Sequence, residues 1–363
     1  MKKTVLSFLL VTILAACSSS ESTTTTDSQL DDLIHAWVDL YSNEWLPDVQ
    51  EKAVAFDAEI DLYCSDTELN TIEASQTAWI TLNTAWQKVR VLNSLTFTDE
   101  SQTLGSVSLA TRIHTGHEFD TVDGASAVSA YLLDPSTPDD LFNGNANLQG
   151  MPALEYVLFS GDIDVSQSCE GLQKISDNLL LVFNTLLNTW QENKEDLKYP
   201  AEIVGGFTSE VDVVEDFLNG LYAYLREINR YKLEIPLGFS SGVIETERAE
   251  SRYSEQTLVT LEANYAAFKF LFLDGDYNLS TFLNSVGRTD INTELNQIFT
   301  VIDTSLSTIE TEVQNTVISD QEDSDYQRYK VLFDASTELV VLFEEGIIPA
   351  AGATENFNKT DGD

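Results

Sequence analysis

One glutamate stands alone in an apolar run of this sequence. Glu155 lies within LQGMPALEYVLFSGD, residues 148–162, and nothing else from Met151 to Phe159 is ionisable. A carboxylate buried without a partner is costly, so it must find a donor or a cation, or take up a proton. A helix that is apolar on all sides is a buried helix, so we expect Glu155 to point into the interior or into a cleft.

A second group that could do chemistry is IHTGHEFD, which holds His114 and His117 beside Glu118. A zinc peptidase helix needs His-Glu-x-x-His, which places both imidazoles one turn apart. The order here is His-x-x-His-Glu, with Gly116 inside. We therefore interpret these histidines as polar loop residues that are dispensable for folding and for bound metal, with a metal site as the less favoured alternative.

The N-terminus reads as an export signal. Two lysines at positions 2 and 3 precede an apolar stretch, residues 5–14, which is shorter than the roughly 20 residues that span a bilayer. Leu14-Ala15-Ala16-Cys17 then resembles a bacterial lipobox. We predict that residues 1–16 are a lipoprotein signal peptide, the alternative being an ordinary cleaved signal with an incidental cysteine.

Cleavage at this point would leave Cys17 as the lipidated first residue of the mature protein. The residue after it is Ser18 rather than aspartate, which favours anchoring in the outer membrane, facing the periplasm. Residues 17–28 are rich in serine and threonine without apolar periodicity, so they are expected to form a flexible tether.

The charge of the chain excludes some partners. With 19 basic and 60 acidic residues the formal charge is −41, and it becomes −43 when the two signal lysines are removed. Nucleic acid and anionic lipid surfaces are therefore excluded as partners. Such a surface suits cations or a basic protein, although a salt-adapted, solvated surface is the favoured explanation.

Two cysteines, Cys64 and Cys169, remain after Cys17. Exported proteins with two cysteines usually pair them, so a disulfide is predicted. A metal site built from two distant thiols and a catalytic thiol are the less favoured alternatives.

Helical periodicity dominates the chain, and no series of alternating strands is evident. We predict an all-α protein of two helical bundles side by side, residues 29–203 and 204–350, with a hint of internal duplication and a disordered tail at 351–363. The junction is the proline- and glycine-containing segment KYPAEIVGGFTSE. Helix starts are predicted at Ser65, Thr208 and Ser254.

Three blocks resemble the imelysin family of exported helical bacterial proteins. Gly150 and Glu155 match its Gly-x-His-x-x-Glu signature, and KLEIPLG, residues 232–238, matches a further element. ERAESRYSEQT resembles the family's C-terminal block. The members of that block are Glu250, Ser251, Arg252, Tyr253, Ser254 and Thr257.

Pro152 stands where the signature has histidine, and proline can neither bind a metal nor shuttle a proton. The resemblance implies a helical-bundle fold and either peptidase activity or a part in iron acquisition, and this proline weakens the peptidase inference. We expect a periplasmic binding or accessory protein in iron or nutrient uptake, working with other envelope uptake proteins. A metallopeptidase and a structural envelope protein are the alternatives.

We expect the signature glutamate and the second block to face each other where the bundles meet. The predicted ligand-binding residues are Gly150, Glu155, Ser251, Arg252 and Ser254, with Arg252 pairing with the Glu155 carboxylate. Iron or another divalent cation is the candidate ligand or cofactor, and no metal-binding residue is assigned. A structural Glu–Arg pair that ties the bundles together is the competing interpretation.

Changing Cys17→Ser should release the protein from the membrane, because the thiol that carries the diacylglyceryl group is lost. Cell fractionation should then move the protein from the membrane to the soluble periplasmic fraction. A wild-type protein that already fractionates as soluble and unlipidated would contradict the lipobox interpretation.

Overall fold

The computed structural model describes residues 22–67, 71–92, 103–104, 107–108, 113–114, 122–134, 142, 145–200, 207–313 and 324–354. Helices make up almost all of this, which confirms the all-α fold. One antiparallel pair of two-residue strands occurs, β1 (Thr103–Leu104) and β2 (Val107–Ser108). The longer helices are α1 (Ser22–Leu40), α2 (Leu46–Ser65), α3 (Ile72–Arg90), α5 (Val122–Leu133), α7 (Gly150–Phe159), α8 (Cys169–Lys198), α9 (Glu210–Glu227), α11 (Thr257–Lys269), α13 (Thr289–Leu306) and α14 (Ser324–Leu342).

Short turns complete the described chain, and four of them are π-helical turns that continue an α-helix without a break. The π-helical turns are η1 (Tyr41–Trp45), η7 (Ile228–Glu234), η9 (Phe270–Asp274) and η11 (Phe343–Ile347). The remaining short elements are η4 (Ala146–Leu148), η5 (Val165–Gln167), α10 (Ile235–Leu237), η8 (Thr246–Arg248), α12 (Leu279–Ser285) and α15 (Ile348–Ala350). Such π turns inside α-helices are frequent at functional sites.

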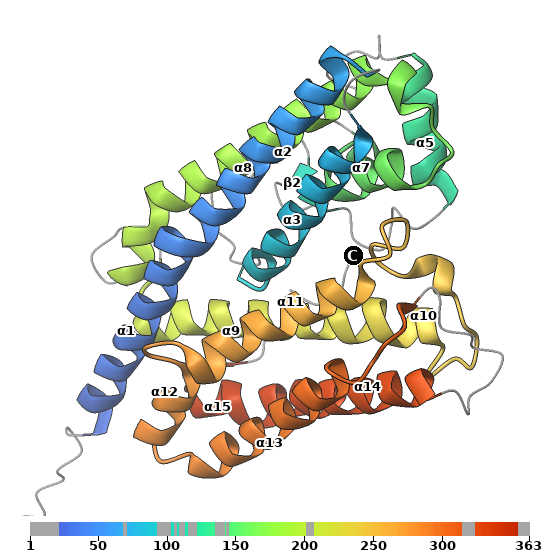
Figure 1. Cartoon of the computed structure of the whole chain (residues 1–363). Helices are drawn as coiled ribbons and strands as arrows, with labels where there is room; N and C mark the ends of the chain where they lie inside the picture. Colours follow the sequence, from blue (N-terminus) through green and yellow to red (C-terminus); the bar gives the residue numbers. More distant parts are fainter. Residues whose placement is uncertain are drawn as a thin grey trace, which may run out of the picture.

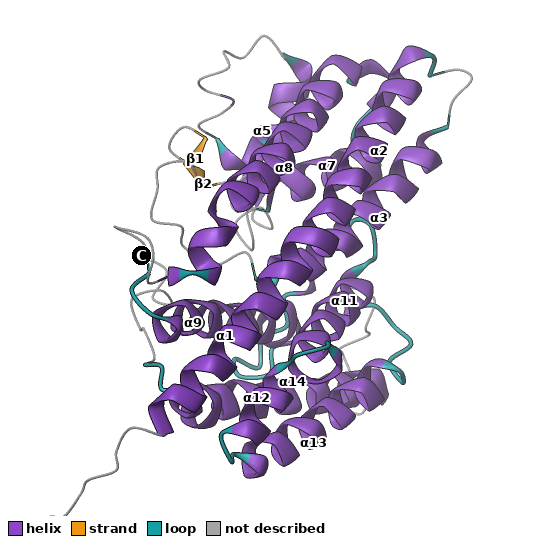
Figure 2. Ribbon diagram, turned by 90° about the vertical axis from the view of Figure 1, so that its left-hand side faces the viewer, coloured by secondary structure: helices purple, strands orange, loops and turns teal. Residues whose placement is uncertain are grey.

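Figures 1 and 2 show the helices gathered in two parts. In the first part α2 packs against α3 and α8, and α7 packs against α3 and α8. In the second part α13 packs against α14, and α9 contacts α14 and α15. Helix α3 also packs on α11, and α1 contacts both α8 and α9, so the two parts share helix contacts. The division at residue 203/204 stays a prediction.

The amphipathic pattern of the sequence accounts for the way the helices pack. In α8 the side chains of Leu172, Ile175 and Leu179 are buried, at the spacing that places them on one face of a helix. Helix α9 begins where Ser209 caps it, because the Ser209 hydroxyl accepts a hydrogen bond from the Asp212 amide at 3.2 Å. The predicted cap, Thr208, lies one residue earlier.

A disulfide joins the start of α8 to the end of α2. Cys64 and Cys169 are 105 residues apart, and their Cα atoms are 5.5 Å apart. Further along the same helix pair, Gln50 Nε2 donates a hydrogen bond to Asn184 Oδ1 at 3.1 Å. The disulfide therefore fixes one end of the antiparallel pair formed by α2 and α8. The hydrogen bond between Gln50 and Asn184 joins the same two helices further along.

Several boundaries differ from the sequence-based expectation. Helix α1 begins at Ser22, inside the segment expected to be a flexible tether, because extending a packed helix by further residues costs little. Ser65 ends α2 rather than starting a helix. The start predicted for the disordered tail, residue 351, is too early. Ala351 and Ala353 are buried, and the Thr354 amide donates a hydrogen bond to Glu215.

Within the described residues, no helix is both long and apolar enough to cross a membrane. The signal peptide, residues 1–16, and the lipidation residue Cys17 lie outside the described residues.

Replacing both cysteines, Cys64→Ser with Cys169→Ser, should lower the free energy of unfolding by roughly 4 kcal/mol, because the long loop is no longer closed in the unfolded chain. Urea unfolding of the two proteins measures this difference. Reductant should destabilise the wild type and leave the double variant unchanged. Equal stability of the two proteins without reductant would contradict the prediction.

Candidate functional site

The apolar stretch around Glu155 forms helix α7, which is buried from Gly150 to Leu158. Helix α3 holds it near both ends. The Trp79 indole donates a hydrogen bond to the Met151 carbonyl at 3.1 Å. The Gln76 amide donates another to the Leu158 carbonyl at 2.7 Å, near the helix end where carbonyls lack partners within the helix. These contacts fix α7 in position.

Gly150, the glycine of the family signature, and Pro152, which replaces the signature histidine, both lie in the first turn of α7. Gly150 has a φ of +77°, which glycine adopts without strain. Pro152 needs no N–H there, so a proline is tolerated where the family has histidine. Glu155 lies in the second turn, where the helix dipole supports its charge less than in the first.

Glu155 is 5% exposed, and its partner is a serine. Its Oε1 atom accepts hydrogen bonds from the Ser254 amide at 2.9 Å and from the Ser254 hydroxyl at 2.8 Å. The predicted pairing with Arg252 is wrong, since Arg252 Nη2 donates to Tyr253 Oη at 2.6 Å. An amide and a hydroxyl satisfy the carboxylate without taking a second charge out of water. The same bond means that Ser254 does not cap α11, which begins at Thr257.

The pKa of Glu155 is raised to about 7. Burial is the largest cause, the bonds from Ser254 act in the opposite direction, and the negative charge of Glu250 adds to the rise. A buried carboxylate that lacks a cation therefore changes its protonation near neutral pH.

A larger cluster surrounds Glu250, seven residues before the start of α11. Its Oε1 atom accepts hydrogen bonds from Gln87 Nε2 at 2.7 Å and Lys232 Nζ at 3.0 Å. Its Oε2 atom lies 3.3 Å from Arg90 Nη1. Gln87 and Arg90 come from α3 in the first part and Lys232 from η7 in the second, so this carboxylate connects the two parts.

Lys232 is 1% exposed, and all three protons of its ammonium group have acceptors. These are Glu250 Oε1 at 3.0 Å, Gln87 Oε1 at 3.0 Å and Asn264 Oδ1 at 2.7 Å. Burial lowers the pKa of Lys232 to about 8, against the attraction of Glu250. The lysine is therefore still charged at neutral pH.

Arg90 supplies the second cation of the cluster. Its Nη2 atom pairs with Glu227, and its guanidinium lies 5.0 Å from the centre of the Tyr224 ring. Burial disfavours the charge, but Glu227, Tyr224 and Glu250 together raise the pKa of Arg90 above its usual range.

The pKa of Glu250 moves in the opposite direction to that of Glu155. Burial alone would raise it, but Lys232, His114 and Arg90 together hold it well below its usual range. Glu250 is therefore an anion at neutral pH.

The interpretation of His114 as a dispensable loop residue is wrong, because His114 is buried in this cluster. Its Nε2 atom lies 3.5 Å from Glu250 Oε2. Burial and the positive charge of Arg90 lower its pKa, so the ring is neutral at pH 7. Its Nδ1 atom has no hydrogen-bond partner among the described residues. His117 and Glu118 lie outside the described residues.

Ser251 ties the second block to α3. Its hydroxyl accepts a hydrogen bond from Asn83 Nδ2 at 3.2 Å, and its φ is +58°, which is unusual for a residue other than glycine. The Gln256 amide bonds to the Ser251 carbonyl at 3.1 Å. The chain between them is therefore held by buried contacts in a strained conformation.

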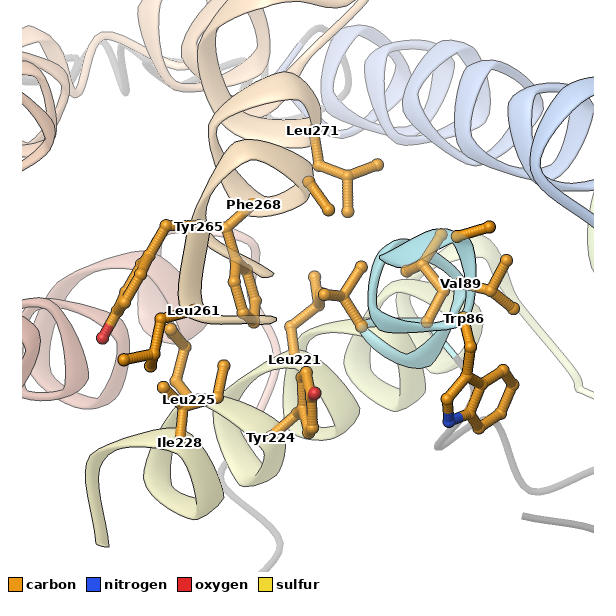
Figure 3. Packing of buried hydrophobic residues seen from close by; sticks show 14 of the residues in the cluster. Trp86, Val89, Leu221, Tyr224, Leu225, Ile228, Leu261, Tyr265, Phe268 and Leu271 are labelled. Carbon is orange, nitrogen blue, oxygen red and sulfur yellow. The ribbon is translucent and has the colours of Figure 1, made fainter. Parts of the chain in front are cut away.

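An apolar frame holds the charged cluster in place. In Figure 3, Trp86 and Val89 of α3 lie in the same buried hydrophobic cluster as side chains from α9 and α11, among them Leu221 and Phe268. All four side chains are buried. Because the polar residues of α3 lie on the same helix as these apolar ones, packing of α3 against the second part fixes the charged groups as well.

The structure brings some predicted site residues together and leaves others apart. Glu155 contacts Ser254 directly, whereas Gly150 shapes the start of α7 and Arg252 contacts Tyr253. The sequence analysis assigned no role to four residues around Glu250, namely Gln87, Arg90, Lys232 and Asn264, and it interpreted His114 as dispensable. Lys232 and Glu250 lie in the family blocks, which was the available signal.

The described residues of this cluster do not fit a metal ion. No group of three or more His, Cys, Asp or Glu side chains that could hold one occurs in the described part of the chain. The carboxylate of Glu250 is already engaged by Lys232 and Arg90, and Pro152 offers no donor. We therefore derive no step through a metal.

These features define a class of protein, namely an all-helical protein with a buried charged cluster between its two helical parts. The sequence profile of the imelysin family matches residues 46–340. The chain belongs to the imelysin family.

Solved structures share this fold. An imelysin-like protein from Psychrobacter arcticum aligns with a TM-score of 0.70 and 17% identity, over 90% of this chain and 98% of that one. A putative iron-regulated protein A precursor from Parabacteroides distasonis aligns with a TM-score of 0.74 and 15% identity, over 90% and 95%. No curated protein matches the sequence.

Changing Glu155→Gln should remove a pH dependence of stability. The folded pKa of about 7 lies above the ordinary value of 4.5, so the stability contributed by this group is full below pH 4.5 and is lost as the pH rises to 7. The variant should gain on the order of 3 kcal/mol relative to wild type across this window. Urea unfolding at several pH values measures the difference, and a difference independent of pH would contradict the prediction.

Changing Glu250→Gln should destabilise the fold by roughly 3–5 kcal/mol, because Lys232 and Arg90 stay buried without their shared anion. A matched control is Asp303→Asn, which breaks the exposed ion pair with Lys269 and should cost less than about 1 kcal/mol. Urea unfolding at pH 7 compares the two variants. Equal losses would contradict the importance assigned to the buried cluster.

Proposed function

We propose that this protein is a cell-envelope lipoprotein that serves as a binding or accessory component in the uptake of iron or another nutrient. Cys17 anchors it to the outer membrane, and the folded part faces the periplasm. The polar cluster between the two helical parts is its ligand site, and its partners are other envelope uptake proteins.

The observation that carries this proposal is the unsatisfied imidazole in a cluster where other groups are paired. Lys232 and Arg90 have protein acceptors, whereas His114 Nδ1 is buried without a described partner. A buried polar atom without a partner costs stability, and none of the described residues pairs with His114 Nδ1. We infer that a bound ligand does.

A purely structural clamp accounts for less of the cluster. Replacing buried ion pairs by apolar residues is often neutral or stabilising, so ion pairs are a poor device for stability alone. Glu155 adds a carboxylate with no cation, close to its protonation midpoint at neutral pH. Perturbed pKa values of this kind gather at functional sites.

Two further observations support a role in uptake. The Parabacteroides protein of the same fold is described as a putative iron-regulated protein A precursor. The formal charge of −41 suits a protein that works among cations.

The test is iron uptake in a strain that lacks the gene. Under iron limitation the deletion should reduce accumulation of radioactive iron, and the wild-type gene should restore it. His114→Gln should fail to restore it although the protein folds, because the variant removes Nδ1 while Gln can still donate to Glu250.

His35→Gln is the matched control, since His35 lies part-buried far along α1 and bonds to the Lys198 carbonyl. It should restore uptake in full. Equal uptake by the deletion and the wild type would overturn the proposed role, and full restoration by His114→Gln would overturn the assigned site.

A further inference from the structure

One arginine near the cluster is held in place without a carboxylate partner. Among the described arginines, four form ion pairs with Asp or Glu, namely Arg90, Arg248, Arg288 and Arg328. Arg226, Arg230 and Arg252 form none within the described part of the chain. The first two are exposed and solvated, whereas Arg252 is half-buried. Within the described part of the chain, this half-buried guanidinium therefore has no carboxylate counter-ion.

Arg252 lies on a platform of aromatic rings. Its guanidinium carbon is 4.6 Å from the centre of the Tyr253 ring, and Nη2 donates to Tyr253 Oη at 2.6 Å. The Tyr253 ring meets the Tyr156 ring edge-on, with centroids 5.2 Å apart. The Tyr156 hydroxyl lies 3.1 Å from Ser129 Oγ. The platform therefore rests on α7 and α5 of the first part.

The backbone on both sides of Arg252 is fixed as well. Ser251 and Glu255 have φ values of +58° and +55°, and such strain in residues other than glycine is found where a functional position is held. Asn83 holds Ser251, and Glu155 holds Ser254. Arg252 is therefore presented by a segment that buried contacts anchor, and its ordering cost is already met before a ligand binds.

A guanidinium has five N–H donors, and one of them is used here. The planar donor pairs match a carboxylate, which they bind through two parallel hydrogen bonds. The field of an acidic chain with Glu250 and Glu155 close by costs a doubly charged phosphate more than a singly charged carboxylate. The geometry of the guanidinium accepts either anion, and the surrounding negative charge favours the carboxylate.

We propose that Arg252 binds the carboxylate group of a small organic acid anion, held against the Tyr253 platform. This inference rests on the proposed function and names the ligand class of the same site, because Arg252 lies two residues from the serine that binds Glu155. A ligand recognised in this way brings its own negative charge to the junction of the two helical parts.

The experiment follows the ¹³C resonances of the arginine guanidinium carbons while acetate is added to the whole folded protein at pH 8 and constant ionic strength. The Arg252 resonance, assigned from Arg252→Lys, should shift and saturate. Arg230 is the internal control, since it also lies over an aromatic ring, Tyr231, at 5.5 Å but is exposed. Its resonance should show no saturable change.

Tyr253→Phe keeps the ring and removes the hydroxyl that holds Nη2, so acetate should bind roughly fivefold more weakly. Equal responses of Arg252 and Arg230 would overturn the proposal. So would saturation of Arg252 by inorganic phosphate at a lower concentration than by acetate.

Neither probe contains iron or a transport partner. A titration in which the Arg252 resonance does not shift would therefore contradict the carboxylate site without affecting the conclusion from the uptake assay. Normal iron uptake in the deletion strain would instead contradict the proposed role in uptake without affecting the conclusion from the acetate titration.

Discussion

The carboxylate of Glu250 is shared by side chains that the sequence places far apart, and the arrangement of the other charged groups depends on it. Lys232 and Arg90 approach from the two helical parts, and His114 approaches from a third segment. Without the shared anion Lys232 would be an uncompensated cation, Arg90 would keep only Glu227, and His114 would lose the partner of its Nε2 atom. The packing of α3 on α11 brings the parts together, and Glu250 accepts hydrogen bonds from polar groups of both.

Two carboxylates at the same junction behave in opposite ways because their partners differ. Glu250 faces cations and stays ionised, whereas Glu155 faces an amide and a hydroxyl and has a pKa of about 7. Burial acts on both in the same direction, so the difference comes from the charge of the neighbours. Ser254 thus gives the junction a site that can gain or lose a proton near neutral pH without breaking an ion pair.

The helical fold could be predicted from the sequence because apolar residues recur at helical spacing over long segments, as in α8. The helix boundaries were harder to predict, because a helix that is packed along most of its length can extend into neighbouring polar residues. Helix α1 does so at its N-terminal end, where it begins at Ser22. At the site, the burial of Glu155 followed from its apolar neighbours, but its partner did not. The predicted partner was the nearest cation in the block, Arg252, whereas the structure uses Ser254. His114 carried no signal, because its burial depends on contacts 136 residues away with Glu250.

The π-helical turn η7 restricts where this chain can lose a residue during evolution. Residues 228–234 wind more loosely than the α-helix on either side, and Lys232 lies within them. Loss of one residue there would turn the following chain by about 100° relative to α9. The lysine would then leave the junction, and KLEIPLG would be presented on another face. During evolution this segment can therefore accept exchanges of exposed side chains far more readily than a single-codon deletion.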